Sequence, residues 1–211
     1  MENLKRKVHG KIALISIDIF KGDFSDEEQN YYYGDTGIDT MPSYKDNMQR
    51  AGKLILDAKA KGIPVVFIRE CHRRNGVDFG RELDGMEREH LYEDSEDSML
   101  PYEELNIDEK DFIVVKRRYS AFFKSDLELV LRGLGVETLI LVGGLTDVCV
   151  HYTFVDGHQN NYYCKVVKDC VGGSSNKPHE ASLVAMEYLQ TGSVIDFEDA
   201  RNILEEYSKN Q

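Results

Sequence analysis

The feature that most constrains the fold is a pair of glycines, Gly143 and Gly144, between an apolar run and a helical pattern. Residues 138–142 form a short run rich in branched side chains, which is typical of a strand buried on both faces. Residues 147–159 contain no proline and repeat apolar side chains at helical spacing. Because glycine adopts unusual backbone angles without steric cost, the pair predicts a sharp turn from strand to helix.

Cys149 falls in the first turn of this predicted helix, at the carboxyl end of the predicted strand. Thr146 and Asp147 precede it and are of the residue types that cap helices. The positive end of a helix dipole lowers the pKa of a nearby thiol, so Cys149 is a candidate thiolate nucleophile. The alternative is a packing role, because free cysteines are among the most buried residues.

Apolar runs alternate with helical patterns along the rest of the chain. This alternation predicts a three-layer α/β/α fold with a doubly wound, mainly parallel sheet of six strands, in one domain of residues 1–211. A flavodoxin-like strand order, 2-1-3-4-5, is expected. Irregular segments near residues 20–42 and 70–110 are expected to cover the site. The other predicted strands are residues 11–18, 64–69, 111–116, 163–168 and 193–197, and the other predicted helices are residues 43–61, 122–134, 178–190 and 198–207.

Composition restricts the class of partner. The net charge of -12 argues against nucleic acid and anionic membranes, because both require a basic surface. No apolar run reaches membrane-spanning length, and the N-terminus lacks the pattern of a signal peptide. The four cysteines show neither a CxxC pair nor zinc-site spacing, so we expect reduced thiols in a cytoplasmic protein. The expected partner is a small-molecule substrate, and no cofactor is expected.

Three reactive side chains follow predicted strands: Asp18, Lys116 and Cys149. Parallel strands present their carboxyl ends at one edge of a sheet, so these side chains are expected to converge. Cys149 would attack a carbonyl carbon, Asp18 would carry the proton to a leaving amine, and Lys116 would favour the ionised forms. Backbone N–H groups of Val148 and Cys149 would bind the oxyanion. Taken singly, each side chain also has a structural explanation, as an ion pair or as core.

Three segments resemble, in order, the motifs of the isochorismatase-like cysteine hydrolases: residues 13–24, 116–122 and 143–156. The resemblance covers nearly the whole chain. It implies an α/β/α fold, a Cys-Asp-Lys triad, and hydrolysis of amide or ureido C–N bonds through a thioester or carbamoyl-enzyme. It also implies a cis peptide bond between Gly144 and Leu145, and a homo-oligomer such as a dimer or tetramer.

Two branches of that family fit the segment after the second predicted strand. Residues 72–85 resemble biuret- and ureide-type amidohydrolases, which implies a small polar substrate and no metal. The nicotinamidase branch has an Asp-x-His pair where this chain has Glu70 and His72. In that branch Asp78 and His90 could complete a metal site of zinc or iron type.

We favour the metal-free interpretation, because Arg73 and Arg74 place positive charge beside the supposed cation. A loop cluster of ion pairs is the structural alternative for the same residues. A non-catalytic binding or assembly protein on the same fold is a further alternative, although all three triad positions are filled. Tyrosines at 31–33 are a candidate subunit contact. The expected substrate contacts are Phe20, Phe24, Glu70, His72, Arg73, Tyr119 and Tyr152.

Overall fold

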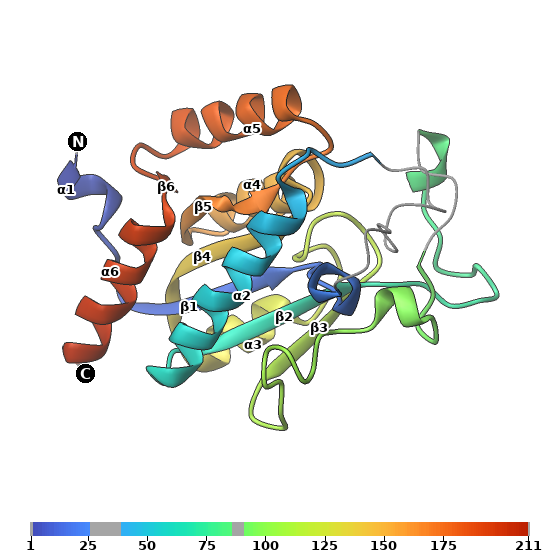
Figure 1. Ribbon diagram of the computed structural model, residues 1–211, viewed down its shortest axis with the longest axis horizontal. Coiled ribbons are helices and arrows are strands. Elements are labelled where there is room, and N and C mark those ends of the chain that lie inside the picture. Colours follow the sequence, from blue (N-terminus) through green and yellow to red (C-terminus); the bar gives the residue numbers. More distant parts are fainter. Residues whose placement is uncertain (1, 26–38, 86–90, 211) are drawn as a thin grey trace.

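The computed structural model describes residues 2–25, 39–85 and 91–210. A twisted sheet lies between two layers of helices (Figure 1). Every strand pairing in this six-stranded sheet is parallel, so the predicted α/β/α fold is confirmed. The strands are β1 (Lys11–Ile17), β2 (Val65–Glu70), β3 (Phe112–Lys116), β4 (Val136–Gly144), β5 (Tyr163–Gly172) and β6 (Val194–Ile195).

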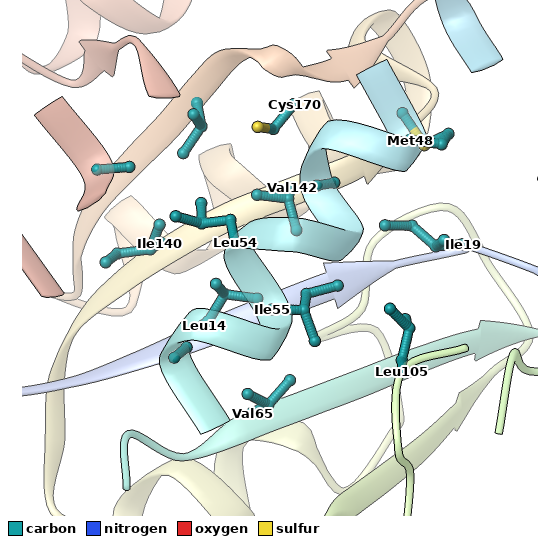
Figure 2. Packing of buried hydrophobic residues seen from close by; sticks show 14 of the residues in the cluster. Leu14, Ile19, Met48, Leu54, Ile55, Val65, Leu105, Ile140, Val142 and Cys170 are labelled. Carbon is teal, nitrogen blue, oxygen red and sulfur yellow. The ribbon is translucent and has the colours of Figure 1, made fainter. Parts of the chain in front are cut away.

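Helices cover both faces of the sheet. Helices α2 and α6 pack on one face, where Leu54 and Ile55 of α2 lie over Leu14, Val65 and Val142 (Figure 2). Helices α3, α4 and α5 contribute to the cluster on the opposite face. Alternate residues of a strand enter opposite clusters, which is why the central strands are near-continuous apolar runs. The helices are α1 (Glu2–Lys5), α2 (Tyr44–Ala60), α3 (Leu127–Leu134), α4 (His151–Gln159), α5 (Asn176–Leu189) and α6 (Phe197–Lys209).

The strand order is β3-β2-β1-β4-β5-β6, so the expected flavodoxin-like order is wrong. From β1 the chain proceeds to one side of the sheet through β2 and β3, and from β4 to the other side. The switch point of the topology therefore lies between β1 and β4, where open α/β sheets bind their ligands. In the observed order β2 lies between β1 and β3, so the residue at its carboxyl end lies beside those of β1 and β3. The expected order would have placed β2 on the far side of β1 from β3.

The two irregular segments are only partly described. Their described parts contain short 3-10 helices at Lys21–Phe24, Glu82–Asp84 and Glu96–Ser98. The tyrosines at 31–33 lie outside the described residues, as does His90. Within the described part of the chain, no helix is both long and apolar enough to cross a membrane.

Candidate active site

The glycine turn packs against two neighbouring elements at once. Gly143 has a φ of +114°, and a Cβ there would collide with the carbonyl oxygen of Ile17 at the end of β1. A Cβ at Gly144 would collide with the hydroxyl of Tyr44 in α2. Only glycine fits both constraints. The Gly144–Leu145 peptide bond, for which the resemblance implies a cis geometry, is cis.

The chain after this turn is a π-helical turn, Thr146–Val150, that continues into α4. Thr146 and Asp147 do not cap this helix, contrary to expectation. The Thr146 hydroxyl shares a 2.9 Å hydrogen bond with Nδ1 of His179 in α5. The Asp147 carboxylate accepts a 2.9 Å hydrogen bond from the backbone N–H of Ser174. Both side chains therefore fasten the π-helical turn, Thr146 to α5 and Asp147 to the segment that leads into it.

One of the two expected oxyanion donors is already engaged. The Val148 N–H donates to the carbonyl oxygen of Leu145 at 3.1 Å. This N–H is therefore engaged within the turn, and the part of Val148 in an oxyanion hole stays a prediction. The role of the Cys149 N–H stays a prediction.

The three predicted reactive side chains converge at the carboxyl edge of the sheet. Nζ of Lys116 lies 2.8 Å from Oδ2 of Asp18 and 3.3 Å from Sγ of Cys149. All three residues are buried. Asp18 has a φ of +49°, in the left-handed region that aspartate tolerates better than most residues. This backbone conformation follows directly after β1, where the carboxylate meets Lys116.

Glu70 is a fourth member of the cluster, and sequence reasoning had placed it only among substrate contacts or metal ligands. It is the register partner of Lys116 across the β2–β3 pair, and the two side chains form an ion pair. The Glu70 carboxylate lies 3.5 Å from Sγ of Cys149. Its backbone N–H donates to Oδ1 of Asp18 at 2.7 Å. Glu70 therefore contacts all three residues of the predicted triad.

The surroundings of the Cys149 thiol shift its pKa upward, the direction opposite to the one expected from the helix terminus. Burial raises the pKa of Cys149 well above its ordinary value. Lys116 opposes that increase, and Glu70 and Asp18 add to it. A thiolate would be a third anion around one ammonium group, so the helix terminus does not decide the pKa here.

The two carboxylates differ in their affinity for a proton. Burial raises the pKa of Asp18, and Glu70 raises it further against the opposing effect of Lys116. Burial also acts to raise the pKa of Glu70. The Lys116 ammonium opposes this effect, and the pKa of Glu70 lies below its usual value. Burial would lower the pKa of Lys116, yet its anionic neighbours hold it well above the ordinary value. The pKa of Asp18 is thus raised and that of Glu70 lowered, which makes Asp18 the better proton acceptor of the two.

The residues after β2 form a cluster of ion pairs. Nδ1 of the buried His72 lies 3.5 Å from Asp78, and its ring meets the Phe79 ring edge-on at a centroid distance of 5.1 Å. Asp78 also pairs with Arg73 at 2.9 Å and with Arg117 at 3.1 Å. This arrangement corresponds to the structural alternative for the segment. Direct substrate contacts of His72 and Arg73 stay predictions.

Metal-ligating geometry arises in a different place from that of the nicotinamidase interpretation. Across residues 2–25, 39–85 and 91–210, one group of three His, Cys, Asp or Glu side chains has ligand atoms within 4.8 Å of one another, namely Asp18, Glu70 and Cys149. The Lys116 ammonium contacts all three. A lysine therefore supplies the positive charge that these groups face.

The ligand set expected for a nicotinamidase-type metal is not assembled in the described part of the chain. Glu70, His72 and Asp78 do not form a group of that kind. Asp78 is instead held by two arginines. His90, the remaining residue of that set, lies outside the described residues. The described geometry gives the metal-assisted alternative no support of its own.

The four aromatic residues expected to contact substrate have different surroundings. Phe20 is fully buried, and Phe24 packs against α2 at Gly52. Tyr119 and Tyr152 lie with ring centroids 5.9 Å apart. Tyr152 is 57% exposed, so it has surface to offer a ligand. A substrate contact stays a prediction for each of the four.

Comparison with known proteins decides the family. Residues 13–199 match the isochorismatase domain. The chain belongs to the isochorismatase family. Among curated relatives, maleamate amidohydrolase of Pseudomonas putida is 36% identical over 89 residues, which are 42% of this chain and 41% of that protein. Ureidoacrylate amidohydrolase RutB of Pseudomonas syringae pv. syringae is 30% identical over 161 residues, which are 66% of this chain and 64% of that protein. The chain thus spans less than two thirds of the length of these relatives.

Solved structures share the fold over almost the whole chain. A cysteine hydrolase from Pseudomonas syringae pv. phaseolicola is 26% identical, with a TM-score of 0.76 and 93% of each chain covered. A pyrazinamidase/nicotinamidase from Streptococcus mutans is 25% identical, with a TM-score of 0.71, over 88% of this chain and 100% of that one. Because the fold is common to proteins of different substrates, the choice between substrates rests on the site.

Proposed function

We propose that this chain is a cysteine-dependent amidohydrolase that cleaves a C–N bond of a small ureido or carboxamide compound. The observation that carries the proposal is the buried contact of the Cys149 thiol with Lys116, at 3.3 Å, beside the carboxylate of Asp18. A nucleophile, a proton carrier and a fixed positive charge are the groups that acyl transfer requires. The names of the amidohydrolase relatives agree with this chemistry.

The first half of the reaction forms a covalent intermediate. The proton of the Cys149 thiol passes to Asp18 as sulfur forms a bond to the carbonyl carbon, and the C=O electron pair moves to the oxygen. This transfer leaves the net charge of the buried cluster unchanged, so it avoids a third anion. When the C–N bond breaks, Asp18 gives the proton to the leaving nitrogen. A thioester, or a carbamoyl-enzyme for a ureide, remains on Cys149.

The second half releases the product with the same proton carrier. Asp18 accepts a proton from a water molecule, and the oxygen of that water attacks the thioester carbon. The C–S bond then breaks, and Asp18 returns the proton to sulfur. Lys116 stays charged throughout and limits the free energy of each anionic state. The thiol of Cys149 and the carboxylate of Asp18 lie within 4.8 Å of each other, and Lys116 contacts both.

The charges around the site favour an uncharged substrate. Arg117 and Arg118 follow Lys116 directly, and each is paired with a carboxylate: Arg117 with Glu93, and Arg118 with Glu82 at 3.3 Å. A substrate carboxylate would compete with these groups. It would also add an anion to a cluster that already holds Asp18 and Glu70. A neutral ureide or amide meets neither penalty.

The test measures ammonia release from a panel of amides, with and without a chelator. The panel contains biuret, triuret, a ureidoacrylate-like acid, N-carbamoyl amino acids, nicotinamide and aliphatic amides. We expect turnover of a neutral ureide, no effect of the chelator, and loss of at least about 10³-fold in Cys149→Ala. Cys170→Ala is the matched control, because Cys170 is buried in the opposite core cluster.

Two results would contradict the proposal. Full turnover in Cys149→Ala would exclude the covalent mechanism. Turnover of nicotinamide alone, abolished by the chelator, would instead favour the metal-assisted nicotinamidase alternative, with Glu70, His72, Asp78 and His90 as candidate metal ligands.

A further inference from the structure

The position of Glu70 in the cluster is not explained by a triad of three residues. A buried carboxylate beside a second carboxylate raises the electrostatic cost of the site unless it has a function or a strong partner. Its side chain faces the Lys116 ammonium and lies 3.5 Å from the nucleophilic sulfur. Its backbone N–H orients the Asp18 carboxylate at 2.7 Å. One residue thus contacts the nucleophile, the proton carrier and the cation.

We propose that Glu70 is a fourth catalytic residue, which serves as the counter-ion of Lys116 and keeps the thiol proton within the cluster for Asp18 to carry. The inference rests on the proposed amidohydrolase function and deepens it. The geometry supports it because one ammonium group cannot neutralise two carboxylates. Lys116 lies beside both carboxylates, so with Glu70 and Asp18 ionised the cluster carries one negative charge more than its ammonium balances, which attracts a proton.

The consequence is that the net charge of the buried cluster stays constant while the thiol proton is transferred. With Glu70 ionised, loss of the thiol proton to solvent would create a third anion, so the proton stays until Asp18 takes it. That same proton is the one that the leaving nitrogen needs. The charged groups that face the sulfur are Lys116 from β3, Glu70 from β2 and Asp18 from the end of β1. His72 is a further titratable group near Glu70.

Replacement of Glu70 by glutamine should separate thiolate formation from turnover. Glu70→Gln keeps the shape and an oxygen acceptor for Lys116 but removes one negative charge. The thiolate then becomes the second anion rather than the third, and the proton leaves to solvent at lower pH. Asp18 starts the reaction without that proton, so the leaving nitrogen is not protonated efficiently.

The first measurement is the pH dependence of iodoacetamide alkylation at Cys149, followed by mass spectrometry without any substrate. We expect the midpoint in Glu70→Gln to fall by at least about one pH unit, so that alkylation at pH 7 is about tenfold faster than in the wild type. The second measurement is turnover of the best amide of the panel. We expect kcat to fall at least about tenfold and the pH optimum to move down.

Faster alkylation with slower turnover is the signature of the proposal. A merely structural role for Glu70 would lower stability and turnover and leave the alkylation midpoint in place. An unchanged or raised midpoint would overturn the inference. Glu128→Gln is the matched control, because it removes a carboxylate from the exposed pair with Arg132 on α3 and should change neither measurement.

A second variant keeps the test decisive if Glu70→Gln does not fold. Glu70→Asp retains the charge but withdraws it by one methylene from Lys116 and from sulfur, so the midpoint should move in the same direction by a smaller amount. The alkylation experiment needs no substrate, which separates the two hypotheses. Full turnover in Cys149→Ala would refute the proposed function alone, whereas an inactive Cys149→Ala with no midpoint shift in Glu70→Gln would refute the role of Glu70 alone.

Discussion

Glu70 and Lys116 are register partners on the adjacent parallel strands β2 and β3, and their side chains form a buried ion pair at the carboxyl edge of the sheet. Lys116 also lies 2.8 Å from Asp18, so one ammonium group serves two carboxylates. Lys116→Met would leave both carboxylates buried without a counter-ion. We expect a loss of roughly 3–5 kcal/mol in the free energy of unfolding at pH 7, measured by urea denaturation.

The double variant Lys116→Met/Glu70→Gln tests that explanation. With one carboxylate removed, Asp18 alone remains unpaired, so the double variant should be more stable than Lys116→Met while it stays inactive. The difference should shrink at pH 5, where the unpaired carboxyls protonate. Equal stability of the two variants at pH 7 and pH 5 would show that the carboxylates are not the cause.

Replacement by alanine should change stability in opposite directions at Gly143 of the glycine turn and at Gly133 of α3. Gly143 has a positive φ, and a Cβ there would collide with the backbone of Ile17. Gly143→Ala should cost roughly 3 kcal/mol or more, or prevent folding. Gly133 in α3 has open space around its Cβ position, so Gly133→Ala should stabilise the fold by about 0.5–1 kcal/mol. Thermal unfolding of the two variants checks both signs, and a similar effect of both would contradict the steric explanation.

Asp23 predicts a dependence of stability on pH. Its buried carboxylate accepts a 2.9 Å hydrogen bond from the Phe20 N–H, and burial raises its pKa to about 7. Between the unfolded pKa of 3.8 and about 7, the folded state holds a proton that the unfolded state has lost. The free energy of unfolding therefore falls as pH rises through this window. Above about pH 7 the carboxyl is ionised in both states, so the Asp23 titration causes no further change.

Asp23→Asn removes this titration and keeps an acceptor oxygen for Phe20. Relative to the wild type, the variant should gain stability as pH rises from 4 to 7, by about 4 kcal/mol at most, and the difference should then level off. Urea denaturation at several pH values measures the difference. Asp84→Asn, at an exposed carboxylate, is the control. A difference that does not change with pH would exclude a raised pKa at Asp23.

The sequence predicted the layers of the fold better than the order of its strands. Apolar runs such as residues 138–142 reveal a buried strand, because both faces of a parallel sheet are covered. Nothing in such a run says which strand lies beside it. The expected order put the strand that ends at Lys116 next to the one that ends at Asp18. In the structure β2 lies between them, and Glu70 at its carboxyl end lies beside both residues.

Two properties of the site depend on contacts that periodicity does not encode. Glu70 lies at the carboxyl end of a predicted strand, as Asp18 and Lys116 do, so the sequence also predicts Glu70 at the carboxyl edge of the sheet. Its contacts with the other side chains are what the pattern does not encode. The pKa of Cys149 was not predictable, because burial and two neighbouring carboxylates outweigh the helix terminus. Thr146 and Asp147 have the composition of caps, but they bond to the neighbouring His179 and Ser174 instead.

Arg117 connects the segment after β2 to the edge strand that carries Lys116. Its guanidinium donates to the Cys71 carbonyl oxygen and to the Glu93 carboxylate, and lies 3.1 Å from Asp78. Arg117→Met keeps the aliphatic stem and leaves these acceptors without their donor. We expect this segment to loosen, with KM for the best amide raised about tenfold and kcat changed much less. The triad is held by the strands themselves, so its geometry should survive.

Steady-state kinetics and hydrogen exchange over residues 71–85 and 91–93 would measure both effects. Arg74→Met is the matched control in the same segment, because Arg74 and Asp94 form an ion pair in which both side chains are 63% exposed. Exposed pairs contribute about 0–1 kcal/mol, so this variant should stay within about twofold of the wild type. Loss of kcat at constant KM in Arg117→Met would mean that the guanidinium acts on the reacting groups rather than on the wall of the site.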